Sequence, residues 1–293
     1  MYDLIQAAEN TYYIDCPAKM GIYRMADNGV ILIDSGNDKE AGRKILKIIT
    51  ENAWTLDTII NTHSNADHIG GNRFLAERTG CKIFANGIER AFCEFPILEP
   101  SFLFGGFPNG HLRHKFLLAE GSSIGDIKDF IPPPGMGIIP LKGHFFDMIG
   151  VKTPDNVYFL ADCVSSEAVL KKYPISYIYD VAEHLKTLDF IETLEGELFI
   201  PAHTEAVKDI KPLATANRQK VYEIIDGIKS ICEAPSSFEV IMKKMFDKYD
   251  AAMNFSQYAL VGSTIKSYLS YMLDNKILEA EINDNFLLWK LCC

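Results

Sequence analysis

The sequence predicts an α/β layered domain followed by a smaller, mostly helical domain. Up to about residue 208, short apolar stretches alternate with amphipathic ones, and this alternation is typical of a β-sheet covered by helices. After residue 208, apolar residues recur at helical spacing almost to the end of the chain. We therefore expect one domain over residues 1–208 and a second over 209–293, which suits a length of 293 residues.

The strands of the first domain are predicted from five short stretches that are rich in β-branched or aromatic residues and bounded by Gly, Asn or Asp. Between them, two longer stretches show the apolar spacing of amphipathic helices. The predicted strands are 29–36, 56–63, 81–86, 156–162 and 196–203, and the predicted helices are 38–52 and 181–195.

Residues 87–137 do not follow this alternation. Phenylalanines are interspersed there with Gly, Pro and polar residues, and the segment is too long for an ordinary loop. Two interpretations remain open. The segment is either an embellishment with a small core of its own or a lid that forms an apolar wall over a functional site.

Three helices and a hairpin are predicted for the second domain, over 211–233, 236–249, 255–276 and 277–291. Helices followed by a hairpin are the order of a winged-helix domain. In a DNA-binding member the third helix is basic, yet Lys266 is its only cation over residues 255–274. We therefore interpret the domain as a packing or dimerisation module and expect a homodimer through it.

The composition argues against several classes of partner. The net charge is −10, and no local cluster of basic residues is present, so nucleic acid and acidic membrane surfaces would be repelled. No apolar run reaches the ~20 residues of a membrane span, and the first residues lack the pattern of a secretory signal. Seven cysteines without a C-x-x-C pair favour free thiols in a reducing compartment. We expect a cytoplasmic protein with a small-molecule substrate.

Potential metal ligands stand where predicted strands end. Residues 62–71 read THSNADHIGG, with two histidines and an aspartate at a strand-to-helix bend. Two later strands also end on a potential ligand, and a further histidine follows the apolar run GIIPL. Rigid strands that deliver imidazoles and carboxylates preorganise a site, and such donors suit zinc, manganese or iron. The candidate ligands are His63, Asp67, His68, His144, Asp162 and His203.

The order of these motifs resembles the metallo-β-lactamase superfamily. A strand followed by H-x-N-x-D-H and I-G-G comes first, then a histidine in a G-H context, an aspartate that ends a strand, and a histidine in P-A-H. The resemblance covers residues 1 to about 208 and implies an αββα sandwich with a two-metal site at one edge of its sheets. It also implies that Asp34, within ILIDSG (31–36), supports the site without binding metal.

The resemblance implies that the ligands divide between two metal ions, with one carboxylate shared. By this division His63, His144 and the residue at position 65 hold the first ion, Asp67, His68 and His203 hold the second, and Asp162 bridges them.

Asn65 departs from the family pattern, because most of the superfamily has H-x-H-x-D-H. An amide oxygen is a weak metal ligand, and hydrogen bonding to a ligand from outside is the alternative role for Asn65. We expect zinc as the cofactor, with one tight and one weak site. Iron and manganese are the alternatives.

A second departure follows His144, where the chain reads GHFFDM (143–148). Asp147 is predicted to orient His144 through the second ring nitrogen. Phe145 makes the surroundings of the site more apolar. The residues that we expect to contact substrate are Phe104, Phe107, Phe145 and Arg113, and a solvated loop is the alternative for Arg113.

The leading hypothesis is a metal-dependent hydrolase that uses metal-activated water on an ester, a thioester or a related small-molecule bond. Asp67 would be its catalytic residue, because it would both bind metal and orient the attacking water. One alternative is a di-iron or di-manganese redox protein that resembles the flavodiiron branch, although no flavin domain is present. A second alternative is a non-catalytic metal-binding protein.

Overall fold

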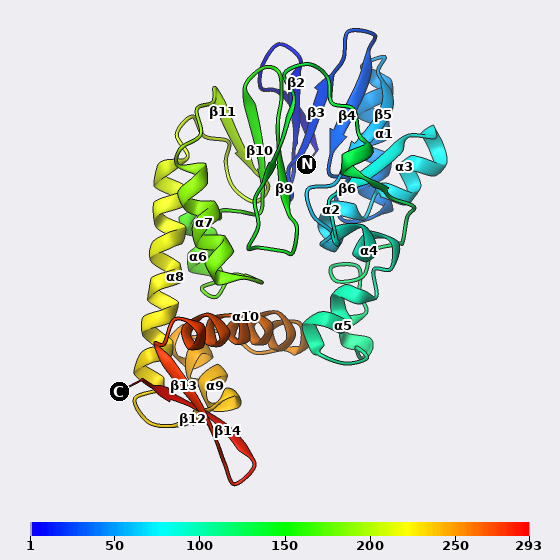
Figure 1. Ribbon diagram of the computed structural model, residues 1–293. Helices are drawn as coiled ribbons and strands as arrows, with labels where there is room; N and C mark the ends of the chain where they lie inside the picture. Colours follow the sequence, from blue (N-terminus) through cyan, green and yellow to red (C-terminus); the bar gives the residue numbers. More distant parts are fainter. Residues whose placement is uncertain (1, 293) are drawn as a thin grey trace.

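Two β-sheets lie face to face in the part of the chain that precedes residue 210 (Figure 1). The computed structural model describes residues 2–292. The first sheet has seven strands in the order β1-β2-β3-β4-β5-β6-β7, and the second has four in the order β11-β10-β9-β8. The strands are β1 (Asp3–Gln6), β2 (Thr11–Asp15), β3 (Met20–Arg24), β4 (Gly29–Ile33), β5 (Thr55–Ile60), β6 (Lys82–Ala85), β7 (Gly125–Asp126), β8 (Gly137–Pro140), β9 (Ile149–Lys152), β10 (Val157–Ala161) and β11 (Leu198–Pro201).

The inner faces of the two sheets share one apolar core. Ile31 and Ile33 of β4 pack in a single cluster with Val151 of β9 and Phe159 of β10. Every residue of β4 is buried, which explains why this strand reads as a continuous apolar run and not as an alternating one. The sandwich is thus held together at its centre by β-branched and aromatic side chains.

Helices cover the outer faces, so the layers follow the predicted αββα order. Ile45 of α1 (Lys39–Glu51) and Leu75 of α3 (Asn72–Thr79) pack on the outer face of the seven-stranded sheet. Leu188 of α7 (Val181–Ile191) packs on the four-stranded sheet. Helix α1 begins after Asp38, whose carboxylate accepts a hydrogen bond from the N–H of Ala41, a strongly preferred N-cap arrangement.

The segment 87–137 shares its small core with the C-terminal part of the chain. Leu103, Leu112 and Leu117 pack against Ala259, and α5 lies at one end of α10 in Figure 1. The segment contains α4 (Glu89–Glu94), α5 (Leu98–Phe104), a short 3-10 helix (Gly110–Leu112), β7 and a second 3-10 helix (Ile127–Asp129).

The last third of the chain contains three long helices and a small antiparallel sheet. The predicted helices and the hairpin are confirmed, and a two-residue strand, which was not predicted, completes the sheet in the order β12-β14-β13. The elements are α8 (Lys211–Ile231), β12 (Ser236–Ser237), α9 (Phe238–Lys248), α10 (Phe255–Asp274), β13 (Leu278–Asn283) and β14 (Phe286–Leu291). Their core also contains Ile175, Ile178 and Val181, so packing crosses the predicted boundary at residue 208.

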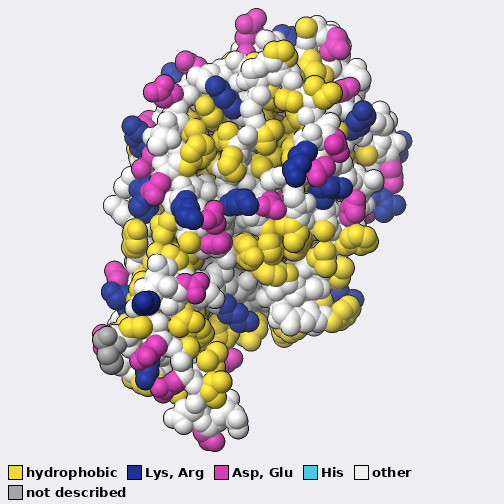
Figure 2. Space-filling model, viewed as in Figure 1, with side chains coloured by type: hydrophobic (Ala, Val, Ile, Leu, Met, Phe, Trp, Pro, Cys, Tyr) yellow, Lys and Arg dark blue, Asp and Glu magenta, His cyan; other side chains and the backbone are white. Residues whose placement is uncertain are grey.

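The face of the molecule in Figure 2 carries charges of both signs. Figure 2 shows Lys and Arg side chains interspersed with Asp and Glu side chains, and hydrophobic side chains gathered over the part of this face that carries α4 and α5. Within residues 2–292, no helix is both long and apolar enough to cross a membrane.

Gly71 permits the close approach of the bend before α3 to the end of β4. A Cβ atom at this position would overlap the backbone oxygen of Ser35, and Ser35 also accepts a hydrogen bond from the N–H of Gly71 (3.1 Å). We expect Gly71→Ala to lower the free energy of unfolding by at least about 2 kcal/mol, because backbone must move. Denaturant titration measures this.

Gly110→Ala is the matched control, since no atom lies within 4 Å of a Cβ atom built there. Its free energy of unfolding should stay within about 0.5 kcal/mol of the wild type. Equal effects of the two substitutions would contradict the packing argument.

Candidate metal centre

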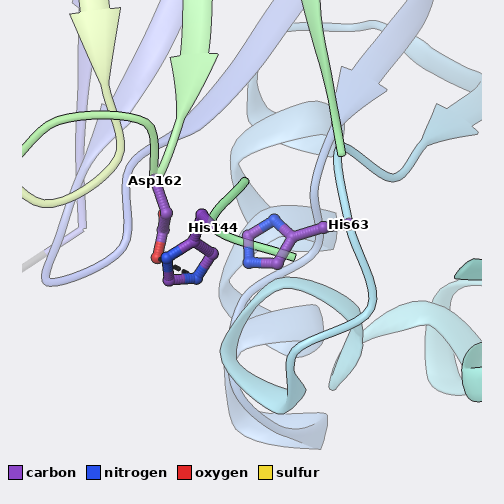
Figure 3. A group of neighbouring side chains, drawn as sticks. All are labelled: His63, His144 and Asp162. Atoms are coloured by element: carbon purple, nitrogen blue, oxygen red, sulfur yellow. Dashed lines mark ion pairs between the residues drawn. The ribbon is translucent and has the colours of Figure 1, made fainter. Parts of the chain in front are cut away.

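The candidate ligands meet at one edge of the sandwich, beyond the ends of strands from both sheets. His63 follows β5, Asp162 follows β10, and His203 follows β11. The short helix α2 (Ala66–Ile69) carries Asp67 and His68. His144 lies in the turn between β8 and β9, and Figure 3 shows its ring together with His63 and Asp162.

The six residues form two adjacent groups. In each group one ligand atom from each residue lies within 4.8 Å of the others, and the groups are His63 with His144 and Asp162, and Asp67 with His68 and His203. The Asp162 carboxylate lies between them: it is 3.6 Å from Nε2 of His144 and 3.2 Å from Nε2 of both His68 and His203. By distance, His63 and His144 thus fall into one group and Asp67, His68 and His203 into the other, with Asp162 between them.

Hydrogen bonds on the outside of the centre orient all four imidazoles. Each ring has its Nδ1 atom within hydrogen-bond distance of an oxygen that can accept a hydrogen bond, so in the neutral, metal-binding form of the ring the lone pair of Nε2 faces the centre. The pairs are His63 with Thr62 Oγ1 (3.1 Å), His68 with Asp34 Oδ2 (2.8 Å), His144 with the Tyr177 carbonyl (3.1 Å) and His203 with the Pro17 carbonyl (2.7 Å).

Asp34 supports two of these rings at once. Its carboxylate accepts hydrogen bonds from the N–H (2.8 Å) and the hydroxyl (2.7 Å) of Thr62 and faces Nδ1 of His68. The Thr62 hydroxyl donates to Asp34, so its oxygen is free to accept from Nδ1 of His63. Asp34 adopts φ +61°, a conformation that non-glycine residues rarely take and that occurs where surrounding contacts enforce it.

Three buried atoms that face the centre lack hydrogen-bond partners within residues 2–292. Nε2 of His63, Nε2 of His68 and Oδ1 of Asp162 are buried and have no hydrogen-bond partner among the described residues. Three such atoms close together would be costly in a protein interior. Coordination of metal ions satisfies all three, and the donor set of imidazoles and carboxylates is one that zinc, iron and manganese accept. The residues therefore fit a metal centre.

The electrostatics favour the ligand forms of the carboxylates. Burial raises the pKa of Asp162, but the imidazoles of His203 and His68 outweigh burial and hold this pKa well below its usual value. The pKa of Asp67 is lowered by His68 and His203 in the same way, against the effect of burial. Burial lowers the pKa of His63. Against burial, Asp162 raises the pKa of His68 well above its usual value, and Asp162 does the same for His203. Metal binding requires ionised carboxylates and neutral imidazoles, so it would displace a proton from each of these two rings.

Asp147 does not orient His144, so that prediction is wrong. Nδ1 of His144 pairs with the Tyr177 carbonyl, which comes from a distant part of the chain. The Asp147 carboxylate instead forms an ion pair with Lys142 (2.8 Å) and accepts a hydrogen bond from the N–H of Ile88 (3.1 Å).

Two buried glutamates at the site were missed by the sequence reasoning. Glu89 in α4 accepts hydrogen bonds from the N–H of Ser64 (3.0 Å) and the N–H of Asp147 (2.8 Å). Glu99 in α5 accepts one from Nδ2 of Asn65 (2.7 Å). Both side chains belong to the segment 87–137 and hold the loop between His63 and α2.

A cavity of about 530 Å³ opens beside the centre and is lined by His144, Asp162 and His203. Its other walls come from the segment after β10 and from α8, including Val164, Leu170, Lys172, Lys220, Val221 and Ile224. Helix α8 was not expected to contribute to the site.

The four residues predicted to contact substrate lie outside the lining of this cavity. Phe145 is fully buried beneath the centre, with its ring centroid 6.4 Å from that of His63. Phe104 and Phe107 are exposed at the surface, and Arg113 lies over the ring of Phe107.

Comparison with known proteins identifies the family. The sequence profile of the Metallo-beta-lactamase superfamily matches residues 13–203, a span that contains all six candidate ligands. The chain belongs to the metallo-beta-lactamase superfamily. Proteins of this superfamily bind metal ions, in agreement with the fit of the ligands.

Two superfamily members similar to this chain are hydroxyacylglutathione hydrolases. The protein from Rhodobacter capsulatus is 32% identical over 92 residues, which are 31% of this chain and 36% of that protein. The protein from Erythrobacter litoralis is 30% identical over 122 residues, which are 35% of this chain and 49% of that protein. The chain thus matches less than half the length of either relative.

Solved structures of superfamily members share the fold over nearly the whole chain. A beta-lactamase domain protein from Burkholderia ambifaria has a TM-score of 0.75 at 16% identity and covers 99% of this chain and 93% of its own. A metallo-beta-lactamase family protein from Thermus thermophilus has a TM-score of 0.70 at 15% identity, with 96% and 98% covered. At these identities the likeness concerns the fold alone.

The ligand geometry predicts the effect of removing one donor. Asp67→Ala and His203→Ala should each abolish tight binding of one metal ion, because each removes a donor from the group that also contains His68. Elemental analysis after dialysis measures the loss. His114→Ala is the control, since that ring pairs with Ser256 (3.0 Å) outside the centre. A full metal complement in either ligand variant would contradict the assignment.

The buried Glu89 predicts a pH dependence of stability. Burial raises its pKa to about 7 from 4.5, although hydrogen bonds from Ser64 and Asp147 oppose the shift. The folded state binds this proton more tightly than the unfolded state, so the stabilisation is complete below pH 4.5 and is lost as the pH rises through 7.

Relative to Glu89→Gln, the metal-free wild type should therefore lose up to about 3 kcal/mol of unfolding free energy between pH 4.5 and pH 7. Denaturant titrations of both proteins across this range isolate the contribution of this carboxyl group. A difference that does not change with pH would contradict it.

Proposed function

We propose that this chain is a metal-dependent hydrolase that cleaves ester or thioester bonds of small molecules. The observation that carries the proposal is the convergence of four imidazole Nε2 atoms and two carboxylates beside a cavity of about 530 Å³, a volume typical of small-molecule sites. The two similar hydroxyacylglutathione hydrolases support a thioester as the bond that is cleaved.

Zinc is the metal that we propose, because imidazole and carboxylate donors that leave a position open are typical of catalytic zinc sites. The first set of ligands includes the neutral amide of Asn65, a weaker donor than an imidazole or a carboxylate, which supports one tight and one weak site. His63, His144 and Asn65 would hold the first ion, Asp67, His68 and His203 the second, and Asp162 would lie between the two.

The residues around the centre have separate tasks in such a reaction. Bound metal ions acidify water and polarise a carbonyl group. Asp67 retains 33% of its side-chain exposure and stays ionised, so its carboxylate accepts a hydrogen bond from the attacking water and orients it. The apolar wall with Leu170 and Val221 excludes bulk water from one side of the cavity.

Two lysines support a substrate with an anionic group. Lys172 and Lys220 both line the cavity, and Lys220 forms an ion pair with Glu223 (2.5 Å). Lys172 brings positive charge to the cavity of a chain whose net charge is −10, and an anionic substrate group would compete with Glu223 for Lys220. A carboxylate on the thiol part of a thioester would complement this charge.

The proposal is tested by depleting the protein of metal, adding back zinc or manganese, and measuring thiol release from a hydroxyacylglutathione. We expect thioester hydrolysis that depends on added metal and is abolished by a chelator. Fully metal-loaded protein that hydrolyses neither thioesters nor esters would refute the proposal. Two bound irons with a visible charge-transfer band would favour the redox alternative.

The position of the two lysines in the cavity wall predicts that KM rises when either one is removed. Lys172→Met and Lys220→Met should each raise KM for a carboxylate-bearing thioester about two- to fivefold, as expected for a partly exposed ion pair, while kcat stays unchanged. Steady-state kinetics with a thioester that lacks carboxylates separates charge from packing, because its KM should not change.

The matched control is Lys171→Met, since Lys171 neighbours Lys172 but does not line the cavity. Equal increases in KM for Lys171→Met and Lys172→Met would show that the charge of the cavity itself has no special role.

A further inference from the structure

The side-chain amide of Asn65 has a different neighbour at each end. Its Nδ2 atom donates a hydrogen bond to Oε1 of Glu99 (2.7 Å). Its Oδ1 atom lies 3.2 Å from Nε2 of His144. Glu99 is buried, with 4% of its surface exposed, and the backbone N–H of Ala66 also faces its carboxylate. The amide is therefore held between the segment 87–137 and the metal centre.

The two atoms on the metal side are both acceptors. A neutral imidazole carries one proton, and in His144 that proton is at Nδ1, which faces the Tyr177 carbonyl. Nε2 of His144 and Oδ1 of Asn65 thus direct lone pairs toward the same space, with no proton between them. A cation in this space would satisfy both atoms.

The separation of these atoms also suits a shared metal ion. Zinc ligands lie about 2.0–2.1 Å from the ion, so two ligands of a tetrahedral site are about 3.3 Å apart. The observed separation of 3.2 Å agrees with that spacing. Nε2 of His63, which lacks a hydrogen-bond partner among residues 2–292, belongs to the same group of ligands.

We propose that Glu99 is a positioning residue that holds the Asn65 amide with its oxygen toward the metal ion of His63 and His144, so that this oxygen is a third side-chain ligand besides the shared Asp162. Glu99 accepts the N–H of the amide and thereby selects which end faces the ion. A carboxylate that orients a metal-binding histidine acts by the same principle. Here the oriented ligand is an amide.

The opposite orientation of the amide is the competing arrangement. It would bring Oδ1 of Asn65 to 2.7 Å from a Glu99 oxygen. That contact requires a proton on Glu99, and burial raises the pKa of Glu99 well above its usual value. The same orientation would place an N–H against Nε2 of His144. In that arrangement the amide blocks His144 from binding metal. Loss of the contact with Glu99 would then strengthen metal binding, whereas our proposal predicts that it weakens binding.

The inference rests on the metal centre of the proposed function, and its test measures metal affinity and not hydrolysis. Zinc is titrated by calorimetry into metal-free wild type, Glu99→Met and Glu99→Gln. Met has a similar length but no acceptor for the amide, and we expect it to weaken the lower-affinity site about ten- to hundredfold. Gln retains an acceptor oxygen, and its affinity should stay within a few-fold of the wild type.

A double-mutant cycle separates positioning from a general effect on the loop. In an Asn65→Ala background, Glu99→Met should change the affinity of the weak site less than twofold, because no amide remains to be oriented. The control is Glu89→Gln, which alters the contact with Ser64 and should change affinity by the same factor in both backgrounds. The thermal unfolding midpoint of each metal-free variant reports whether it is folded.

Two sets of results would overturn the inference. The first is unchanged or tighter zinc binding by Glu99→Met. The second is an equal loss with and without Asn65, which would mean that Glu99 acts on the fold of the loop alone. Substitution with cobalt gives an independent readout, since losing an oxygen ligand changes the absorption of the weak site. A failed thioester assay with intact two-site binding would refute only the proposed function.

Discussion

The hydrogen bonds behind the histidines determine the chemistry of the centre, because the proton at Nδ1 decides what Nε2 can bind. Asp34 has the largest part in this arrangement. It accepts hydrogen bonds from Thr62 and faces His68, and through the Thr62 hydroxyl it also sets the proton of His63. One buried carboxylate at the end of β4 therefore fixes two ligands of different metal groups. The strained backbone at Asp34 is maintained because these bonds outweigh its cost.

The candidate ligands were accessible from the sequence because strand ends are local features. His63, Asp162 and His203 each follow an apolar run whose strand the structure contains, and parallel or adjacent strands bring such ends to one edge of a sandwich. The backbone acceptors behind two of the rings were not accessible. The carbonyl oxygens of Tyr177 and Pro17 have no sequence signature, since any residue provides one. Asp147, three residues after His144 in the sequence, was predicted in this role, and Tyr177 was not considered.

The segment 87–137 shows why irregular regions resist sequence reasoning. Two of its phenylalanines, Phe104 and Phe107, were predicted to contact substrate, yet both are exposed and lie outside the lining of the cavity. Its contribution comes from Glu89 and Glu99, which are buried against a loop that lies about 25 to 34 positions earlier. Acidic residues are usually solvated, so no pattern in the sequence separates these two from the exposed ones. Only the fold brings them beside Ser64 and Asn65.

Because α8 forms part of the cavity wall, the residues that select a substrate and the residues that bind metal belong to different regions of the chain. The candidate metal ligands come from loops and the short helix α2 at one edge of the sandwich. Lys220, Val221 and Ile224 come from a helix of the C-terminal region. Substitutions along one face of α8 can therefore alter which molecule enters without changing a single ligand. Selectivity and reactivity can therefore evolve in separate regions of the chain. An engineered change of substrate would begin in α8, where an unsuccessful substitution leaves the metal centre intact.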